Sequence, residues 1–340
     1  TFSGLLTGLV AGFPVDVMAQ GTETAEPAVA LVGINVMPLD GPRVLSDQTV
    51  LIADGHIHSV GPRGSIKVPE GADVYELPGR WVLPGLIDMH VHVFSEDELP
   101  LYLDAGITSV RNMWGWDLHL GLREAVASGS MIGPRVFTSG RLLDGDPPVL
   151  RGSAALSTPA EAREEVARQT RAGFDGIKVY DGLSPDVFAA VMLAAERAGL
   201  PVWGHPPESV GVHGALAVGV ATLEHLRGVP EALGTGDEGW SASLDPGAMA
   251  DLALRFREAG TTVVPTLIVH ESADLSAAEQ QTLLESPTVA RIPEGLRSFC
   301  CGGADDPKDD LDPNVREQRH RNRRDVVAAL HSSGVRLLVG

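Results

Sequence analysis

The chain has 340 residues and a formal net charge of −19, and 44% of its residues are hydrophobic. This length is sufficient for one large barrel, or for a barrel with a small accessory domain, each with its own core. Nucleic acids and anionic membrane surfaces are excluded as partners, because both require a basic surface. No apolar run reaches the roughly 20 residues that span a bilayer, so an integral membrane protein is also excluded.

The first 20 residues resemble the remnant of a signal peptide. A short apolar run, Gly4 to Phe13, is followed by Val17-Met18-Ala19, and a basic start is missing. A buried N-terminal strand is the alternative, although Pro14 and Asp16 interrupt the run. We therefore expect a secreted or periplasmic protein.

The only cysteines, Cys300 and Cys301, are adjacent, which is a poor geometry for an unstrained disulfide. They show no metal-ligand spacing either. The sequence leaves the role of this pair and the oligomeric state open, including a homo-oligomer.

Residues 28 to 83 are expected to form a small β-sheet domain. Short β-rich runs separated by turns occur at Ala30–Met37, Thr49–Ala53, His56–Val60 and Val74–Leu77. From residue 84 to 340, short apolar strands alternate with amphipathic segments of helical period, which is typical of βα units around a parallel sheet. Eight such strands predict an α/β fold, a closed (β/α)₈ TIM barrel. The eight strands are Leu86–His92, Ile107–Met113, Arg135–Ser139, Gly176–Tyr180, Pro201–His205, Thr222–Leu226, Thr261–Leu267 and Arg336–Val339.

Two helices between these strands carry clear boundary signals. Pro159–Ala172 and Pro185–Ala198 each begin with a proline, which suits a first helical turn, and each is followed by a glycine that suits a C-terminal cap. The connection between strands seven and eight, from about Val269 to Pro313, is unusually long and ends in the acidic run Asp305–Asp312. It is either a lid or substrate wall, or a disordered surface loop.

Four histidines are expected at the carboxyl ends of three strands. His90 and His92 lie two apart on the first strand and project from the same face, while His205 and His225 close the fifth and sixth strands. A single histidine at such a position is more simply a structural residue. Four at one rim of a barrel, the rim that carries active sites, indicate a metal centre.

Lys178 ends the fourth strand, in an otherwise apolar and small segment. The chain uses arginine for almost all its cations and has only three lysines, so this lysine at the barrel mouth needs a reason. An ammonium cannot bind a metal, but a lysine that carries carbon dioxide as a carbamate becomes an anionic ligand able to bridge two cations. The alternatives are an ion pair with Asp181 or contact with a substrate carboxylate.

This order of histidine and lysine ligands on strands one, four, five and six resembles the amidohydrolase superfamily. The surrounding segments, Trp81–His90, Gly106–Arg111 and Gly176–Tyr180, are similar to its imidazolonepropionase-related and prolidase-like branch, whose members include many exported bacterial proteins. The resemblance covers the chain from about Ala28 to Gly340.

The resemblance implies two divalent metal ions, zinc, in a binuclear site. His90 and His92 would hold one ion, His205 and His225 the other, and a carboxylated Lys178 would bridge them. It also implies that the β domain is half of a sandwich completed by C-terminal strands. His56 and His58, which have the same spacing as the first pair, would then merely lie on a sandwich strand.

A metal-bridging hydroxide would hydrolyse C–N bonds in a small amide, peptide-like or cyclic amide substrate. The same metal frame also serves esters and phosphotriesters. The alternative function is a non-catalytic, metal-stabilised barrel that binds a ligand or a partner.

In the resembling family the catalytic aspartate directly follows strand eight, whereas this chain ends Leu337-Leu338-Val339-Gly340. We therefore expect a fragment that contains no catalytic proton-transfer residue and is inactive alone. Tyr180 and Arg111 are candidate substrate-binding residues, for a tetrahedral oxyanion and a carboxylate respectively. Core packing or a surface ion pair is the alternative for both.

Overall fold

The computed structural model describes residues 27–292, 294, 297 and 311–340. The chain divides into two compact units, the first ending at Pro84 and the second running from Gly85 to Gly340. The signal-peptide remnant and the pair Cys300 and Cys301 lie outside the described residues. In the part of the chain that is described, no helix is both long and apolar enough to cross a membrane.

The first unit is a single small sheet. The strand order is β3-β2-β1-β4, with β5 paired to β1. β1 pairs antiparallel with β2 and parallel with β4 and β5. The strand bounds are β1 Val29–Val36, β2 Leu45–Ala53, β3 His56–Pro62, β4 Asp73–Glu76 and β5 Trp81–Val82.

Seven parallel strands and the last residues of the chain form the barrel of the second unit. Its regular strands are β6 Leu86–Val91, β7 Ile107–Asn112, β8 Arg135–Thr138, β11 Ile177–Val179, β12 Val202–Gly204, β13 Thr222–Glu224 and β14 Thr262–Val264. β6, β7 and β8 form one run and β11 to β14 another, and a parallel bridge between Ser139 and Gly176 joins them. The predicted α/β class is confirmed.

The eighth segment closes the barrel, although it is no regular strand. Leu337 forms a parallel bridge with Val263 on one side, and the amide of Met89 donates to the Val339 carbonyl at 2.8 Å on the other. Two short extra strands, β9 Leu143–Asp144 and β10 Ala154–Ala155, extend the sheet beside β11.

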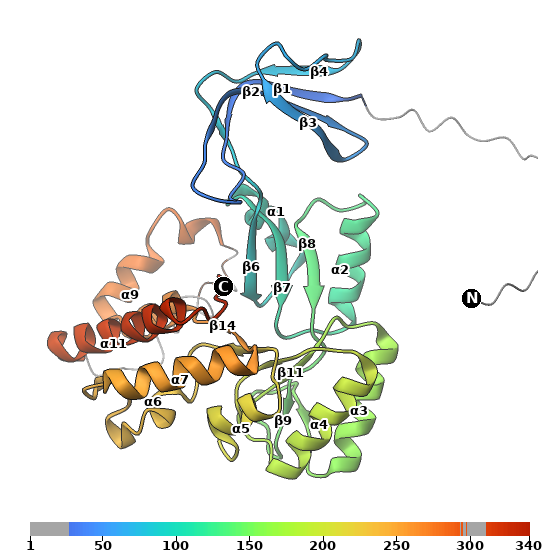
Figure 1. Ribbon diagram of the computed structural model, residues 1–340. Coiled ribbons are helices and arrows are strands. Elements are labelled where there is room, and N and C mark those ends of the chain that lie inside the picture. The colour runs from blue at the N-terminus through green and yellow to red at the C-terminus, as the bar shows by residue number, and fades with distance from the viewer. Residues whose placement is uncertain (1–26, 293, 295–296, 298–310) are drawn as a thin grey trace, which may run out of the picture. The chain divides into compact units, whose positions relative to one another are not determined.

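Helices cover the barrel strands (Figure 1). Two of them, α3 Pro159–Ala172 and α4 Pro185–Ala198, have the predicted bounds, which are confirmed. The hydroxyl of Thr158 caps the first turn of α3, and that of Ser184 caps the first turn of α4. Gly173 ends α3 with φ 87°, a left-handed conformation that favours glycine. The remaining helices are η1 Glu96–Glu98, α1 Leu99–Asp104, α2 Asp117–Ala127, α5 Gly211–Ala217, α6 Val229–Ala232, η2 Gly236–Ser241, α7 Pro246–Ala259, α8 Leu267–Ala273, α9 Ala277–Leu284, η3 Val289–Arg291 and α11 Pro313–Ser332.

One sequence expectation about the last third of the chain was wrong, and one alternative for the long connection does not hold in its described part. The seventh strand ends at Val264, not Leu267, because Thr266 adopts a left-handed turn, φ 41°, and α8 begins directly after it. In the described part of the long connection, α8, α9 and η3 occupy most of residues 267–291, so the alternative of a disordered loop does not hold there. A lid or substrate wall stays a prediction.

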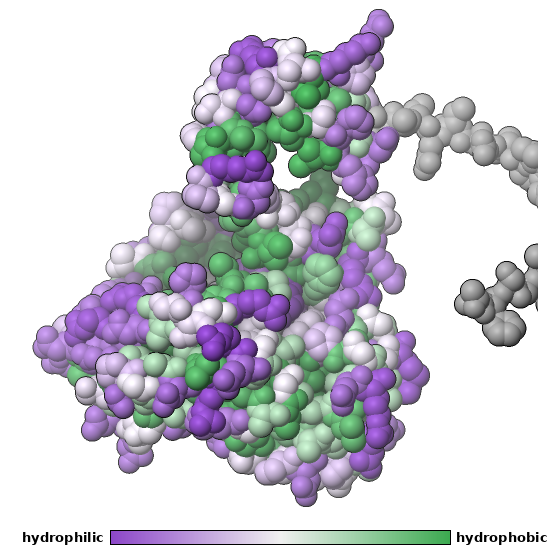
Figure 2. Space-filling view, viewed as in Figure 1, coloured by the Kyte–Doolittle hydropathy of each residue, from purple (hydrophilic) through white to green (hydrophobic). Residues whose placement is uncertain are grey.

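The last helix, α11, shows how the barrel is covered. Val326 and Leu330 are buried against the core, and the surface over α11 is hydrophilic (Figure 2). Arg323 is also buried and donates to Asp274 at 2.6 Å. An apolar face and one buried ion pair therefore attach this helix to the barrel.

Candidate metal centre

The four histidines predicted at the strand ends, here called the four-histidine group, lie together at the ends of β6, β12 and β13. The ring centroids of His90 and His225 are 4.3 Å apart, those of His90 and His92 5.3 Å, and those of His205 and His225 5.2 Å. His225 has φ 59°, which is uncommon for a residue other than glycine. This turn ends β13 and brings the His225 ring against that of His90.

Three of these rings are oriented by hydrogen bonds at Nδ1. His90 Nδ1 donates to Glu224 at 2.8 Å, and His205 Nδ1 donates to Asp181 at 2.9 Å. His225 Nδ1 shares a hydrogen bond of 2.5 Å with the Thr266 hydroxyl. A carboxylate behind an imidazole is the arrangement that orients histidines in metal sites.

The opposite nitrogens of His90 and His205 are buried and unused. Nε2 of each has no hydrogen-bond partner among the described residues. A buried polar atom without a partner is costly in a folded protein and calls for an explanation, such as an unseen ion. Two imidazoles thus offer a lone pair into the same region, which is the donor chemistry of a metal site.

Burial lowers the pKa of all four imidazoles, and the positive charge of Lys178 lowers each pKa further. The pKa of His92 falls to about 3 and that of His205 to about 4. At neutral pH the rings are uncharged, which is the form in which histidine binds a metal.

Lys178 stands among these rings on β11. Its side chain is almost fully buried, with 1% exposure for the residue, and its amine forms no hydrogen bond or ion pair with any residue that the structure describes. The ion pair with Asp181 considered from the sequence does not form. Burial lowers the pKa of the Lys178 amine to about 8.

Arg111, a candidate substrate residue on β7, is packed inside the barrel, as in the alternative considered from the sequence. It is 2% exposed, and its guanidinium donates to the Met89 carbonyl at 2.7 Å, the Thr222 hydroxyl at 3.1 Å and Glu224 at 2.9 Å. It also lies 4.8 Å from the ring centre of Trp203. The geometry therefore assigns Arg111 to the support of Glu224 inside the barrel, because every nitrogen of the guanidinium is already used.

Tyr180, the other candidate substrate residue, is partly exposed and stacks on His205, with ring centroids 4.3 Å apart. Burial raises the pKa of its hydroxyl. The phenol therefore stays protonated at neutral pH and can donate a hydrogen bond.

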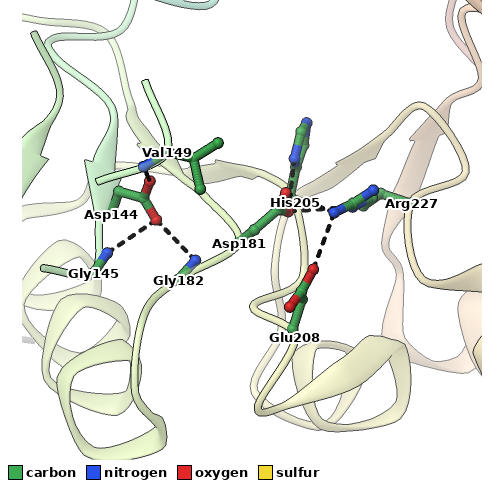
Figure 3. A network of polar contacts seen from close by, with 8 residues as sticks. All are labelled: Asp144, Gly145, Val149, Asp181, Gly182, His205, Glu208 and Arg227. Atoms are coloured by element: carbon green, nitrogen blue, oxygen red, sulfur yellow. Dashed lines mark hydrogen bonds and ion pairs between the residues drawn. The ribbon is translucent and has the colours of Figure 1, made fainter. Parts of the chain in front are cut away.

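A polar network holds the loops around this region (Figure 3). The fully buried Asp144 accepts hydrogen bonds from the amides of Gly145, Val149 and Gly182. Beside it, Asp181 bonds His205. These hydrogen bonds fix the loop that carries Asp181, and they thereby help to hold the ring of His205 in place.

Glu224, Asp181 and Thr266 were not predicted from the sequence as hydrogen-bond partners of the histidines. A signal was present for two of them: Glu224 is a charge inside a buried strand, directly before His225, and Asp181 directly follows the strand of Lys178. His56 and His58 are exposed on β3 in the first unit, where the ring of His56 bonds the Asp54 carbonyl.

Across the described residues, no three His, Cys, Asp or Glu side chains are placed to hold one metal ion together. Gly340 lies against the four-histidine group, since a Cβ atom built on it would stand 2.8 Å from the Cβ of His90.

No protein-family model matches the chain. An adenine deaminase of Chelativorans sp. (strain BNC1) is 37% identical over 71 residues, which cover 21% of this chain and 12% of that protein. An imidazolonepropionase of Pseudomonas paraeruginosa (strain DSM 24068 / PA7) is 27% identical over 275 residues, covering 62% of this chain and 67% of that protein.

Two solved structures match over 92% of this chain. Bottromycin amidohydrolase has a TM-score of 0.65 and 26% identity, with 68% of its own chain covered. A Xaa-Pro dipeptidase with bound methionine in the active site has a TM-score of 0.60 and 22% identity, with 79% covered. The chain belongs to the amidohydrolase superfamily and is similar to its prolidases in structure and to its imidazolonepropionases in sequence.

Proposed function

We propose that the protein is a metal-dependent hydrolase of C–N bonds in small amide or peptide-like substrates. Membership of the amidohydrolase superfamily supports the reaction class, and the methionine bound to the matching dipeptidase supports an amino-acid-like substrate. The observation that carries the proposal is the buried Lys178 amine, which has no described partner and is surrounded by neutral imidazoles.

Lys178 is suited to carboxylation. With its pKa at about 8, a substantial fraction of the amine is neutral near physiological pH. The neutral nitrogen adds to the carbon of carbon dioxide and loses a proton, which leaves an anionic carbamate with two oxygen ligands. This shared carbamate supplies the third protein ligand that no set of three unmodified side chains provides.

The donor set fits two divalent cations, zinc. His90 and His92 would hold one and His205 and His225 the other, with the carbamate shared between them. Neutral imidazoles, unused Nε2 atoms and carboxylates at Nδ1 all agree with this assignment. When bound, zinc supplies Lewis acidity and a water of lowered pKa.

The neighbouring side chains orient the reaction. Tyr180, protonated and stacked on His205, would donate to the carbonyl oxygen as it gains charge. Glu224 and Asp181 hold the rings of His90 and His205 in one orientation.

Metal content tests the site. His90→Ala should lower the zinc bound per chain in elemental analysis, because it removes one of four imidazoles, and Lys178→Met should lower it further by removing the bridge. His56→Ala and His58→Ala are matched controls, since this pair has the same spacing as His90 and His92 but lies exposed on β3.

Equal zinc loss from the control pair and from His90→Ala would contradict the site. Catalysis is tested separately, as hydrolysis of N-acyl amino acids by the whole gene product with zinc and bicarbonate supplied. Zinc binding without turnover of any amide or ester would favour the binding module over the enzyme.

A further inference from the structure

Arg227 lies beside the four-histidine group and keeps part of its guanidinium free. Nε and Nη2 donate to Asp181 at 3.3 and 2.8 Å, and the oxygen that accepts from Nε also accepts from His205 Nδ1 (Figure 3). The imidazole and the guanidinium therefore meet at one atom. The Arg227 side chain is 47% exposed, and its Nη1 makes no hydrogen bond with any described residue.

A pocket of about 470 Å³ lies against this guanidinium, between the loops that follow β12 and β13. This volume suits a small organic molecule. Its walls combine apolar side chains with the Arg227 cation, with His213 and with the carboxylates of Glu208 and Glu231. The apolar side chains beside the cation match a ligand that carries an aliphatic group next to an anion. The apolar lining residues are Pro206, Val210, Val212 and Ala232.

Glu208 occupies the accessible side of Arg227. Its carboxylate accepts from Nη2 at 3.1 Å, and its side chain is 74% exposed. A pair this exposed contributes little net stability, because water competes for both charges. A second carboxylate can therefore replace Glu208, whereas Asp181, 11% exposed and also bonded to His205, stays in place.

The length of a substrate limits where its carboxylate can bind. One residue of a peptide spans at most about 3.3–3.6 Å, so a carboxylate next to the scissile amide must be bound by a cation close to the metal ligands. Arg111 cannot do this, because Met89, Thr222 and Glu224 use its nitrogens inside the barrel. Arg227 adjoins His205 through Asp181 and opens on the pocket.

We propose that Arg227 binds the free carboxylate of the substrate, that the adjoining side chain enters this pocket, and that Glu208 holds the place of that carboxylate until substrate binds. The inference rests on the proposed function and narrows its substrate class to N-acyl amino acids and dipeptides. Arginine suits this task because its planar nitrogens match two carboxylate oxygens. Cyclic amides that lack a carboxylate are then poor substrates.

The test is calorimetric binding of two probes, N-acetyl-L-leucine and its carboxamide, to the full chain. The probes have the same shape and differ in charge. The wild type should bind the carboxylate more tightly than the carboxamide. Arg227→Gln should weaken carboxylate binding about tenfold or more and change carboxamide binding little, because a charge-assisted contact is lost only in the first case.

Glu208→Gln should act in the opposite direction and strengthen carboxylate binding about two- to fivefold, as expected for removal of a weak surface competitor. This variant keeps the proposal testable even if Arg227→Gln fails to fold. Arg321→Gln is the matched control, because Arg321 is an exposed arginine that pairs with Glu317 away from the pocket, and it should alter neither affinity.

Equal weakening of both probes by Arg227→Gln would overturn the proposal and leave Arg227 as a residue that only positions Asp181. A wild type that binds both probes equally, or neither, would overturn it too. Zinc content, measured in parallel, separates the two hypotheses. A chain that holds zinc without carboxylate preference removes this inference alone, whereas carboxylate preference without zinc removes the proposed function.

Discussion

At the scale of single residues, Glu224 links the metal centre to the interior of the barrel. One carboxylate oxygen accepts from His90, and the other accepts from Arg111 and from the Thr222 hydroxyl at 2.5 Å. Glu224 has no exposed surface, and its arginine partner is also buried. Buried charges of this kind depend on each other, since removing one leaves the other without compensation.

Glu224→Gln should therefore destabilise the chain by about 3–5 kcal/mol, because the buried Arg111 loses its counter-ion. Zinc affinity should fall about 10- to 100-fold as His90 loses its orienting carboxylate. Thermal unfolding and a zinc titration measure the two effects. Glu231→Gln, an exposed neighbour in sequence, should change neither, and a Glu224→Gln chain as stable as the wild type would contradict the assigned network.

At the scale of elements, Glu165 connects α3 to the segment that follows β8. Its carboxylate accepts from Arg168 at 2.7 and 2.6 Å and from the Gln169 amide at 3.0 Å, and it lies 3.5 Å from Arg141. Burial raises the pKa of Glu165, but the hydrogen bonds and charges of its partners outweigh burial, and the net pKa is lowered.

The pH dependence of stability follows from this direction. Because the folded pKa of Glu165 lies below its unfolded value of about 4.3, the ionised carboxylate stabilises the chain above that value and ceases to do so as pH falls through the folded pKa. Glu165→Gln should therefore be less stable than wild type at pH 7, and the difference should shrink below about pH 4. Urea unfolding at several pH values measures it, and a constant difference would refute the assignment.

At the scale of the whole molecule, closure of the barrel depends on residues 336–339. Three backbone hydrogen bonds hold this segment. The amide of Val263 donates to the Arg336 carbonyl, that of Leu338 to the Val263 carbonyl, and that of Met89 to the Val339 carbonyl. This closure places Gly340 against His90.

Secretion or a periplasmic location stays a prediction, because it depends on residues outside the described part of the chain.

Hydrogen exchange tests the closure. If the eighth segment is part of the barrel, the amides of Met89 and Leu338 should exchange slowly, within about tenfold of an interior strand amide such as that of Ile177. Free exchange at Leu338 together with protection at Ile177 would show that the barrel is open between β14 and β6.

The sequence by itself determined the features that depend on local pattern. The approximate positions of the strands, the bounds of α3 and α4, and the order of His90, His92, Lys178, His205 and His225 could be predicted, because apolar periodicity, proline and glycine signals and the repeated βα unit are local properties. The end of the seventh strand was missed, since a short apolar run fits a strand or a helix equally well.

Only the tertiary structure decided which charges meet. Arg111 and Arg227 look alike in sequence, as each lies near the carboxyl end of a predicted barrel strand. Folding buries the first against Glu224 and leaves the second at a pocket, paired with Asp181 and Glu208. Those partners lie up to 113 positions away along the chain. Hydrogen bonds and desolvation act through space, so the role of a buried charge follows from its partners, which a local pattern does not encode.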